Sequence, residues 1–143
     1  IRRIRAVLDA ARAFGLFVVH TRQGFRADLA DCPDFQKRKF REVSGFDVGV
    51  TVGPLGKVLV RGEPGWHINP AVAPNNHEPI VDKTANDAFL DTDLDTILRT
   101  KRVQHLLVCG HTLDCCVHST LRHARDLNYQ TLLIEDCCGC SSP

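Results

Sequence analysis

Residues 105–134 read HLLVCGHTLDCCVHSTLRHARDLNYQTLLI, and this stretch decides the fold class. It opens on an apolar run over 105–108, which predicts a buried strand that ends at Gly110. Apolar residues then recur at helical spacing, at Val117, Leu121 and Ala124. A second apolar run over 131–134 predicts another strand. This order of strand, helix and strand favours two parallel strands joined by a crossover helix.

The remainder of the chain continues the alternation of helices and strands. The expected elements are a helix over 1–14, a strand buried on both faces over 16–19, a short helix over 35–40, strands over 57–60 and 79–81, and helices starting at Thr92 or Asp93 and at Asp114 as N-caps. Parallel strands need crossovers that cover the sheet. We therefore expect one domain over residues 1–143, a three-layer αβα Rossmann-like fold of the α/β class with a mainly parallel sheet.

Composition narrows the class of protein. A chain of 143 residues with 43% hydrophobic and 24% charged residues is typical of one globular domain. Its net charge of +1 offers no electrostatic footprint for nucleic acid, and the basic cluster over 37–41 is interpreted as a solvated face. No apolar stretch reaches the length of a membrane span or resembles a signal peptide. We expect a cytoplasmic protein that contacts neither nucleic acid nor membrane.

The chain ends and the cysteines carry two further expectations. The sequence starts at Ile1, contains no Met, and stops at Pro143 just after an expected strand, so we expect a fragment of the domain. The seven cysteines are an odd number and include the adjacent pairs Cys115/Cys116 and Cys137/Cys138. This pattern favours free thiols in a reducing compartment over a disulfide framework.

Cys116 is the first candidate for chemistry. It follows the expected N-cap Asp114, so it lies in the first turn of a helix, where free backbone N–H groups favour an anion. A thiolate is the nucleophilic form of cysteine, and the same N–H groups can hold the oxyanion formed when it attacks a carbonyl. A small core residue is the alternative interpretation. Both stay open on this evidence.

Lys83 is the second candidate, because it directly follows an expected buried strand. Ligands of parallel α/β folds bind at the carboxyl ends of strands, where a lysine can serve as a donor or as the partner of a thiolate. A solvated loop lysine is the alternative. The sequence alone supports a shared site only if the fold brings Lys83 to Cys116.

Two rival sites are disfavoured. A cysteine–histidine dyad is conceivable because His111, His118 and His123 flank Cys116, but His118 projects away from it on a helix. A zinc site would use the soft ligands among Cys115, Cys116, Cys137, Cys138 and Cys140. Their spacing lacks the gap of two to four residues typical of structural zinc. We expect no metal.

The stretch Val108 to Arg122 resembles the signature of the isochorismatase-like cysteine hydrolases, and Lys83 with Ala88-Phe89 resembles the lysine motif of the same family. The resemblance extends to residues 19–24, 61–66 and 92–94. It is strongest for biuret amidohydrolases, with ureidoacrylate amidohydrolases second. Nicotinamidases hold a metal at two positions that correspond here to Gln23 and Phe25, which cannot bind one. The resemblance thus implies no metal and no cofactor.

What the resemblance implies is a thiol-dependent amidohydrolase that cleaves a C–N bond of a small amide or ureido substrate and releases ammonia. Cys116 would be the nucleophile, Lys83 its charged partner, and an Asp the base. In the family that Asp lies on a strand ahead of the helix that here begins at Ile1. The alternatives are therefore a larger protein or a non-catalytic relative that binds or scaffolds.

The resemblance also implies the surroundings of the nucleophile. A cis peptide would join His111 to Thr112, in a turn that includes Cys115, with the Cys116 N–H as an oxyanion donor. Thr112, Trp66, Asn86 and Phe89 are expected substrate contacts. The expected partners are a small-molecule amide substrate and further copies of the chain in a homo-oligomer.

Overall fold

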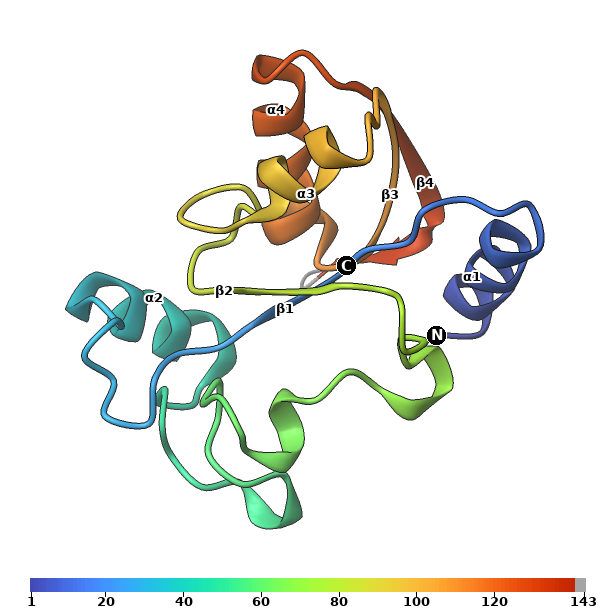
Figure 1. Ribbon diagram of the computed structural model, residues 1–143. Helices are drawn as coiled ribbons and strands as arrows, with labels where there is room; N and C mark the ends of the chain where they lie inside the picture. The colour runs from blue at the N-terminus through green and yellow to red at the C-terminus, as the bar shows by residue number, and fades with distance from the viewer. Residues whose placement is uncertain (141–143) are drawn as a thin grey trace.

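The computed structural model describes residues 1–140 as helices around short parallel strands (Figure 1). In chain order the main elements are α1 (Arg2–Ala13), β1 (His20–Gln23), α2 (Asp34–Ser44), β2 (Ile80–Lys83), α3 (Leu94–Thr100), β3 (His105–His111), the π-helical turn η4 (Leu113–Val117), α4 (His118–Asp126) and β4 (Gln130–Gly139). Three 3-10 turns, Gly53–Leu55, Pro64–Trp66 and Pro70–Val72, lie between α2 and β2. Among the described helices none is long and apolar enough to cross a membrane.

The strands pair in parallel, which confirms the expected α/β class. β1 pairs with β2, with Gln23 opposite Lys83, and β3 pairs with β4. Within residues 1–140 these four strands form two separate two-stranded sheets. Local periodicity identifies a strand but not its neighbours, because every strand offers two edges for pairing.

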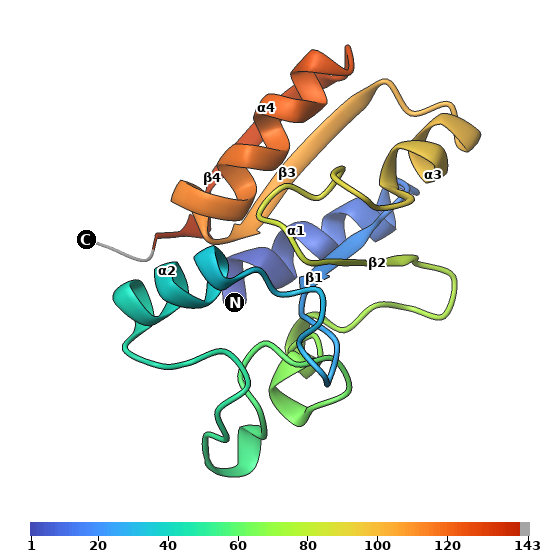
Figure 2. The same ribbon diagram turned by 90° about the vertical axis from the view of Figure 1, so that its left-hand side faces the viewer.

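Helices cover the strands on two sides. In Figure 1, β3 and β4 lie between α4 on one side and α1 on the other, and Figure 2 shows α2 and α3 on opposite sides of the molecule. The main core joins β2, α3 and α4 through Val81, Ala88, Phe89, Leu94, Leu98, Ala124 and Tyr129. A second small cluster, Phe25, Cys32 and Val48, forms within the long segment that joins β1 to β2.

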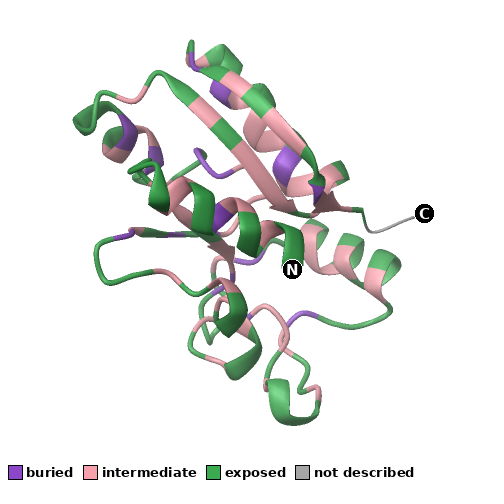
Figure 3. Ribbon diagram, turned by 90° about the vertical axis from the view of Figure 1, so that its right-hand side faces the viewer, coloured by how far each residue is buried: buried purple, intermediate pink, exposed green. Residues whose placement is uncertain are grey.

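The first strand begins later than its apolar sequence predicts. Residues 16–19 are irregular, with Leu16 48% and Phe17 37% exposed, whereas β1 starts at His20. Pairing explains the shift, because the ladder with β2 opens at His20 opposite Ile80. The outer surface of α1 is likewise mostly exposed or half-buried (Figure 3), and Leu8 is its one buried residue.

Two other sequence expectations are corrected. Residues 57–60 form no strand, because Val60 makes only an isolated bridge to Phe25 and Lys57 one to Thr51. Asp114 is not an N-cap, because the helix starts earlier, and Thr112 holds that position. The N-cap of α3 is Asp93, one of the two expected positions, and its side chain makes no capping hydrogen bond. The hydroxyl of the preceding Thr92 accepts the N–H of Leu94 at 3.2 Å.

Candidate active site

The ends of β1 and β2 bring a glutamine beside a lysine. Lys83 is 4% exposed, and its register partner is Gln23. The Lys83 ammonium donates to the carbonyl oxygens of Ala85 at 2.7 Å and Asn86 at 2.9 Å. It also donates to Oε1 of Gln23 at 3.3 Å and to Sγ of Cys116 at 3.4 Å. A buried ammonium is thus held at the carboxyl ends of two parallel strands.

Cys116 is delivered to this point by the turn that follows β3. It is the fourth residue of η4, and the Thr112 carbonyl accepts the N–H groups of Cys115 at 3.2 Å and Val117 at 3.1 Å. The peptide bond between His111 and Thr112 is cis. The Cys116 sulfur lies 3.5 Å from Oε1 of Gln23 as well as 3.4 Å from Lys83. The expected meeting of Lys83 and Cys116 therefore occurs.

The Lys83 ammonium has one sulfur among its hydrogen-bond acceptors. The three oxygens that accept from Lys83 are neutral, and the fourth acceptor is the Cys116 sulfur. A buried charge is stable only where hydrogen bonds and an opposite charge compensate for lost water. Ionisation of Cys116 would place that opposite charge 3.4 Å from the ammonium. The arrangement can therefore support a nucleophilic sulfur.

The loop after Lys83 is anchored to α4 by two polar contacts. Asp87 accepts Nδ1 of His123 at 2.5 Å, and the Ala88 N–H donates to the hydroxyl of Thr120 at 3.1 Å. Asp87 also accepts the N–H groups of the two residues 89 and 90, each at 3.0 Å. Because this loop supplies two carbonyls to Lys83, the anchors fix the ammonium as well as the loop.

The Trp66 ring packs against residues at the end of β1. The Arg22 guanidinium stacks 3.4 Å from the centre of the Trp66 ring, and the ring also packs against the backbone of Gly24. Successive side chains of a strand point to opposite faces, so Arg22 and Gln23 lie on opposite faces of β1. Because Trp66 packs on Arg22, it covers the face of β1 that Gln23 does not occupy. Its indole N–H is buried without a partner among residues 1–140. A substrate contact of Trp66 stays a prediction.

The other expected residues fall into different environments. Phe89 is 7% exposed and stacks on Tyr129 in the main core, and its substrate contact stays a prediction. Asn86 is half-buried beside Lys83, and Thr112 is half-buried at the start of the turn. His111 is exposed at the end of β3. Substrate roles for Asn86 and Thr112 stay predictions.

The remaining cysteines form a different environment. Burial, with smaller contributions from the nearby Cys137 and Cys138, raises the pKa of the Cys109 thiol to about 11. Burial likewise raises the pKa of Cys137. Within residues 1–140 no three His, Cys, Asp or Glu side chains gather as a metal site. The absence of metal from the mechanism stays a prediction.

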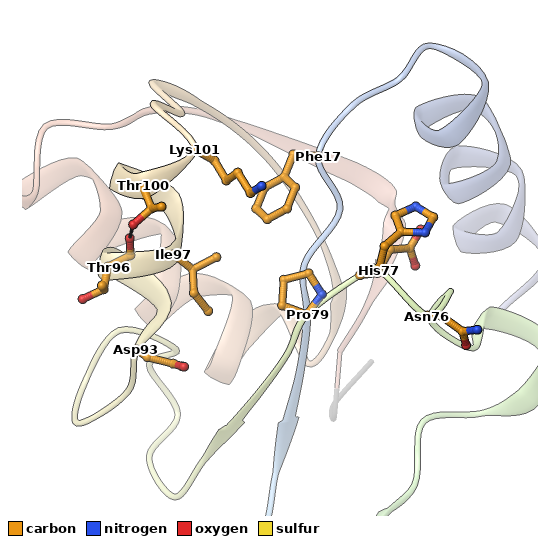
Figure 4. Close-up of a pocket in the computed structure, with 10 residues that line it drawn as sticks. Phe17, Asn76, His77, Pro79, Asp93, Thr96, Ile97, Thr100 and Lys101 are labelled. Atoms are coloured by element: carbon orange, nitrogen blue, oxygen red, sulfur yellow. Dashed lines mark hydrogen bonds between the residues drawn. The ribbon is translucent and has the colours of Figure 1, made fainter.

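A surface pocket lies at the opposite end of the β1–β2 pair (Figure 4). It is lined by Phe17, Pro79, Ile97 and Lys101 among others, and Pro79 directly precedes β2. Lys83 lies at the other end of that strand. The pocket is therefore separate from the Lys83–Cys116 cluster, and the contacts of reactive groups, not the hollow, locate the candidate site.

Sequence reasoning missed Gln23 as a member of this cluster. The residue was considered only as a position where related enzymes hold a metal, because the first strand was expected to end at Val19. The available signal was the rule that strand ends carry sites, applied to the correct strand. Once β1 is extended to Gln23, its register with Lys83 follows from the parallel pairing.

The chain is an α/β domain with parallel strands and crossover helices. At the ends of its strands, a cysteine in the turn before a helix faces a buried lysine. The chain belongs to the isochorismatase domain family, whose family model matches residues 1–143. The predicted superfamily is therefore confirmed.

Known proteins resemble the chain over nearly all of its length. The ureidoacrylate amidohydrolase RutB of Rhizobium rhizogenes is 28% identical over 137 residues, which cover 95% of this chain and 56% of that protein. Among solved structures, an isochorismatase family protein from Desulfovibrio vulgaris subsp. vulgaris str. Hildenborough has a TM-score of 0.81 and 29% identity, covering 98% of this chain and 67% of its own. A cysteine hydrolase from Pseudomonas syringae pv. phaseolicola has a TM-score of 0.82 and 28% identity, covering 97% and 59%. The chain spans little more than half of the curated relative's length.

Proposed function

We propose that the protein is a thiol-dependent amidohydrolase that cleaves a C–N bond of a small amide or ureido compound. The observation that carries the proposal is the contact of 3.4 Å between the Lys83 ammonium and the Cys116 sulfur. A lysine so deeply buried is costly unless it serves an anion, and a thiolate is the anion this site can form. The amidohydrolase activity in the name of the Rhizobium rhizogenes relative agrees with this chemistry.

The proposed reaction has two stages. The Cys116 thiol gives its proton to a carboxylate base, which the family resemblance assigns to a strand ahead of α1, and the sulfur attacks the amide carbonyl. The C–N bond breaks, the nitrogen takes up the proton and leaves as ammonia or an amine, and an acyl thioester remains. Water then hydrolyses the thioester and restores the thiol. The N–H of Cys116 serves as an oxyanion donor.

Biuret is the first substrate to test, because residues 61–66 and the pattern around Cys116 were interpreted as similar to those of biuret amidohydrolases. Ureidoacrylate is the second, since a relative bears that name. Both carry the same reactive unit, a carbonyl flanked by nitrogen. The proposal therefore specifies a ureido-type carbonyl rather than one complete molecule.

Ammonia release by the complete protein tests the proposal. Cys116→Ser should lower kcat on biuret or ureidoacrylate by about 10³-fold or more, because an alcohol lacks the ionised nucleophile. Lys83→Met should lower it by about 10²-fold or more. Cys140→Ser, at an exposed cysteine, is the matched control and should keep full activity. Full activity of Cys116→Ser would refute the proposal, and binding without turnover by the native protein would favour a non-catalytic relative.

A further inference from the structure

We infer that Gln23 selects nitrogen-bearing substrates, its side-chain carbonyl accepting the N–H of the very amide that Cys116 attacks. The inference rests on the proposed function and adds the group that recognises the amide. Gln23 is the third residue of the cluster formed with Lys83 and Cys116. Neither the sequence motifs nor the proposed reaction gives Gln23 a role.

The position of the acceptor suits this task. Oε1 of Gln23 lies 3.5 Å from the Cys116 sulfur. A carbonyl carbon poised for attack lies about 3 to 3.5 Å from its nucleophile, and the amide nitrogen is one bond further on. A nitrogen placed in this way can reach Oε1 at a normal N–H···O distance of about 2.9 Å.

The orientation of the Gln23 amide is fixed by its other end. Nε2 donates to the carbonyl oxygen of Thr84 at 3.1 Å, which turns Oε1 toward the sulfur. The backbone is held as well, because Gln23 is in register with Lys83 across the β1–β2 ladder. Rotation of the amide would bring Nε2 against the Lys83 ammonium and leave the Thr84 carbonyl facing an oxygen. The acceptor is therefore presented in one orientation.

Ionisation of the thiol leaves this acceptor in need of a donor. In the resting site, Oε1 accepts from the Cys116 thiol at 3.5 Å and from Lys83 at 3.3 Å. Both contacts are longer than those from Lys83 to the carbonyls of Ala85 and Asn86, at 2.7 and 2.9 Å. A thiolate has no proton to donate, so Oε1 loses one of its two donors as the nucleophile forms. The N–H of a substrate amide can donate to Oε1 in place of the thiol. An ester oxygen has no proton, so its lone pair would face the lone pair of Oε1.

The test compares an amide with an ester in the complete protein. The substrates are biuret and methyl allophanate, in which OCH3 replaces one terminal NH2 of biuret, and the products measured are ammonia and methanol. Gln23→Leu should lower the ratio of kcat/KM for the amide to that for the ester by about 5- to 10-fold, the effect of one lost neutral hydrogen bond. The ratio cancels any change in thiol ionisation, because both substrates use the same sulfur. Gln23→Met, unbranched and apolar, replaces the leucine variant if that variant does not fold.

A second readout separates this inference from the proposed function. Cys116 is alkylated with iodoacetamide or with methyl iodoacetate, which form the same S–C bond and release iodide, and labelling is followed at the Cys116 peptide. Gln23→Leu should lower the amide-to-ester ratio of alkylation rates even if the native protein turns over neither substrate. That result would support Gln23 while the hydrolase proposal fails. Unchanged ratios in folded Gln23 variants would overturn the inference, whatever the turnover of the native protein.

Discussion

Glu78 accepts two hydrogen bonds from the guanidinium of Arg12, from Nε and Nη2, each at 2.7 Å. The same carboxylate accepts Nε2 of His20 at 2.9 Å and the N–H of Asn75 at 2.9 Å. Glu78 is 8% exposed, so this is a nearly buried ion pair. It ties α1 to the start of β1 and to the loop that leads into β2.

The Glu78 cluster should make the fold sensitive to acid. Its hydrogen bonds from Arg12, opposed by burial and aided by Asn75 and His20, hold the pKa of Glu78 well below its usual value. A depressed folded pKa stabilises the protein above the unfolded value of about 4.3, and this stabilisation is lost as the pH falls below it toward the folded value. Glu78→Gln should lower the free energy of unfolding at pH 7 by about 3 kcal/mol.

Urea unfolding at pH 7 and pH 3 measures this effect. The native protein should lose more stability between the two pH values than Glu78→Gln does. Asp9→Asn, which removes the exposed Arg5–Asp9 pair, is the control and should cost under about 1 kcal/mol. If the free energy of unfolding fell by the same amount between pH 7 and pH 3 in the native protein and in Glu78→Gln, the Glu78 cluster would not be the cause of the acid sensitivity.

A side chain at Gly24 should displace the Trp66 ring. A Cβ there would lie 2.5 Å from both Cδ1 and Nε1 of Trp66. Gly24→Ala should therefore lower the free energy of unfolding by about 1 to 3 kcal/mol, the usual cost of overpacking. In a Trp66→Ala background the same substitution should cost clearly less, and a double-mutant cycle measures the difference. An identical cost in both backgrounds would remove the ring as the cause.

The two ends of the Asp87–His123 pair should contribute unequally. Asp87→Ala removes the acceptor for His123 and for two backbone N–H groups, whereas His123→Ala leaves Asp87 with both backbone partners. We expect Asp87→Ala to lower the free energy of unfolding by about 2 kcal/mol and His123→Ala by about 1 kcal/mol. Urea denaturation checks the order, and a larger loss for His123→Ala would contradict it.

The cysteines should differ in their reaction with iodoacetamide. With its pKa raised to about 11 by burial, Cys109 is almost wholly protonated at pH 8 and should be labelled much more slowly than an exposed cysteine. Cys140 is exposed and should be labelled early. Time-resolved peptide mass spectrometry reports both rates in one sample. Comparable rates at the two positions would contradict the burial of Cys109.

Sequence reasoning succeeded where local pattern and pairing agree. The stretch from β3 to β4 was predicted as strand, helix and strand because apolar runs bound a helix with one apolar face. It failed at β1, where His20 to Gln23 is polar and becomes a strand only through pairing with residues 80–83. Because the first strand was expected to end at Val19, the sequence did not place Gln23 beside Lys83.

The same distinction explains the outcome for the site residues. Cys116 and Lys83 were identified by short motifs, and their contact followed from the rule that strand ends meet. Trp66 was expected to contact substrate because residues 61–66 resemble the family. The ring packs against Arg22 of β1 and against Gly24 just after it, and no local sequence pattern specifies such packing.

The two strongest bonds of the Lys83 ammonium join it to residues two and three positions along the chain. These bonds are local, but the loop that makes them is anchored to α4 through the Asp87–His123 and Ala88–Thr120 contacts. The sulfur arrives with η4, which leads directly into α4. An opening that released α4 would therefore take the sulfur away and loosen the loop around the ammonium in the same movement, so that the site would be assembled only while this one helix is packed.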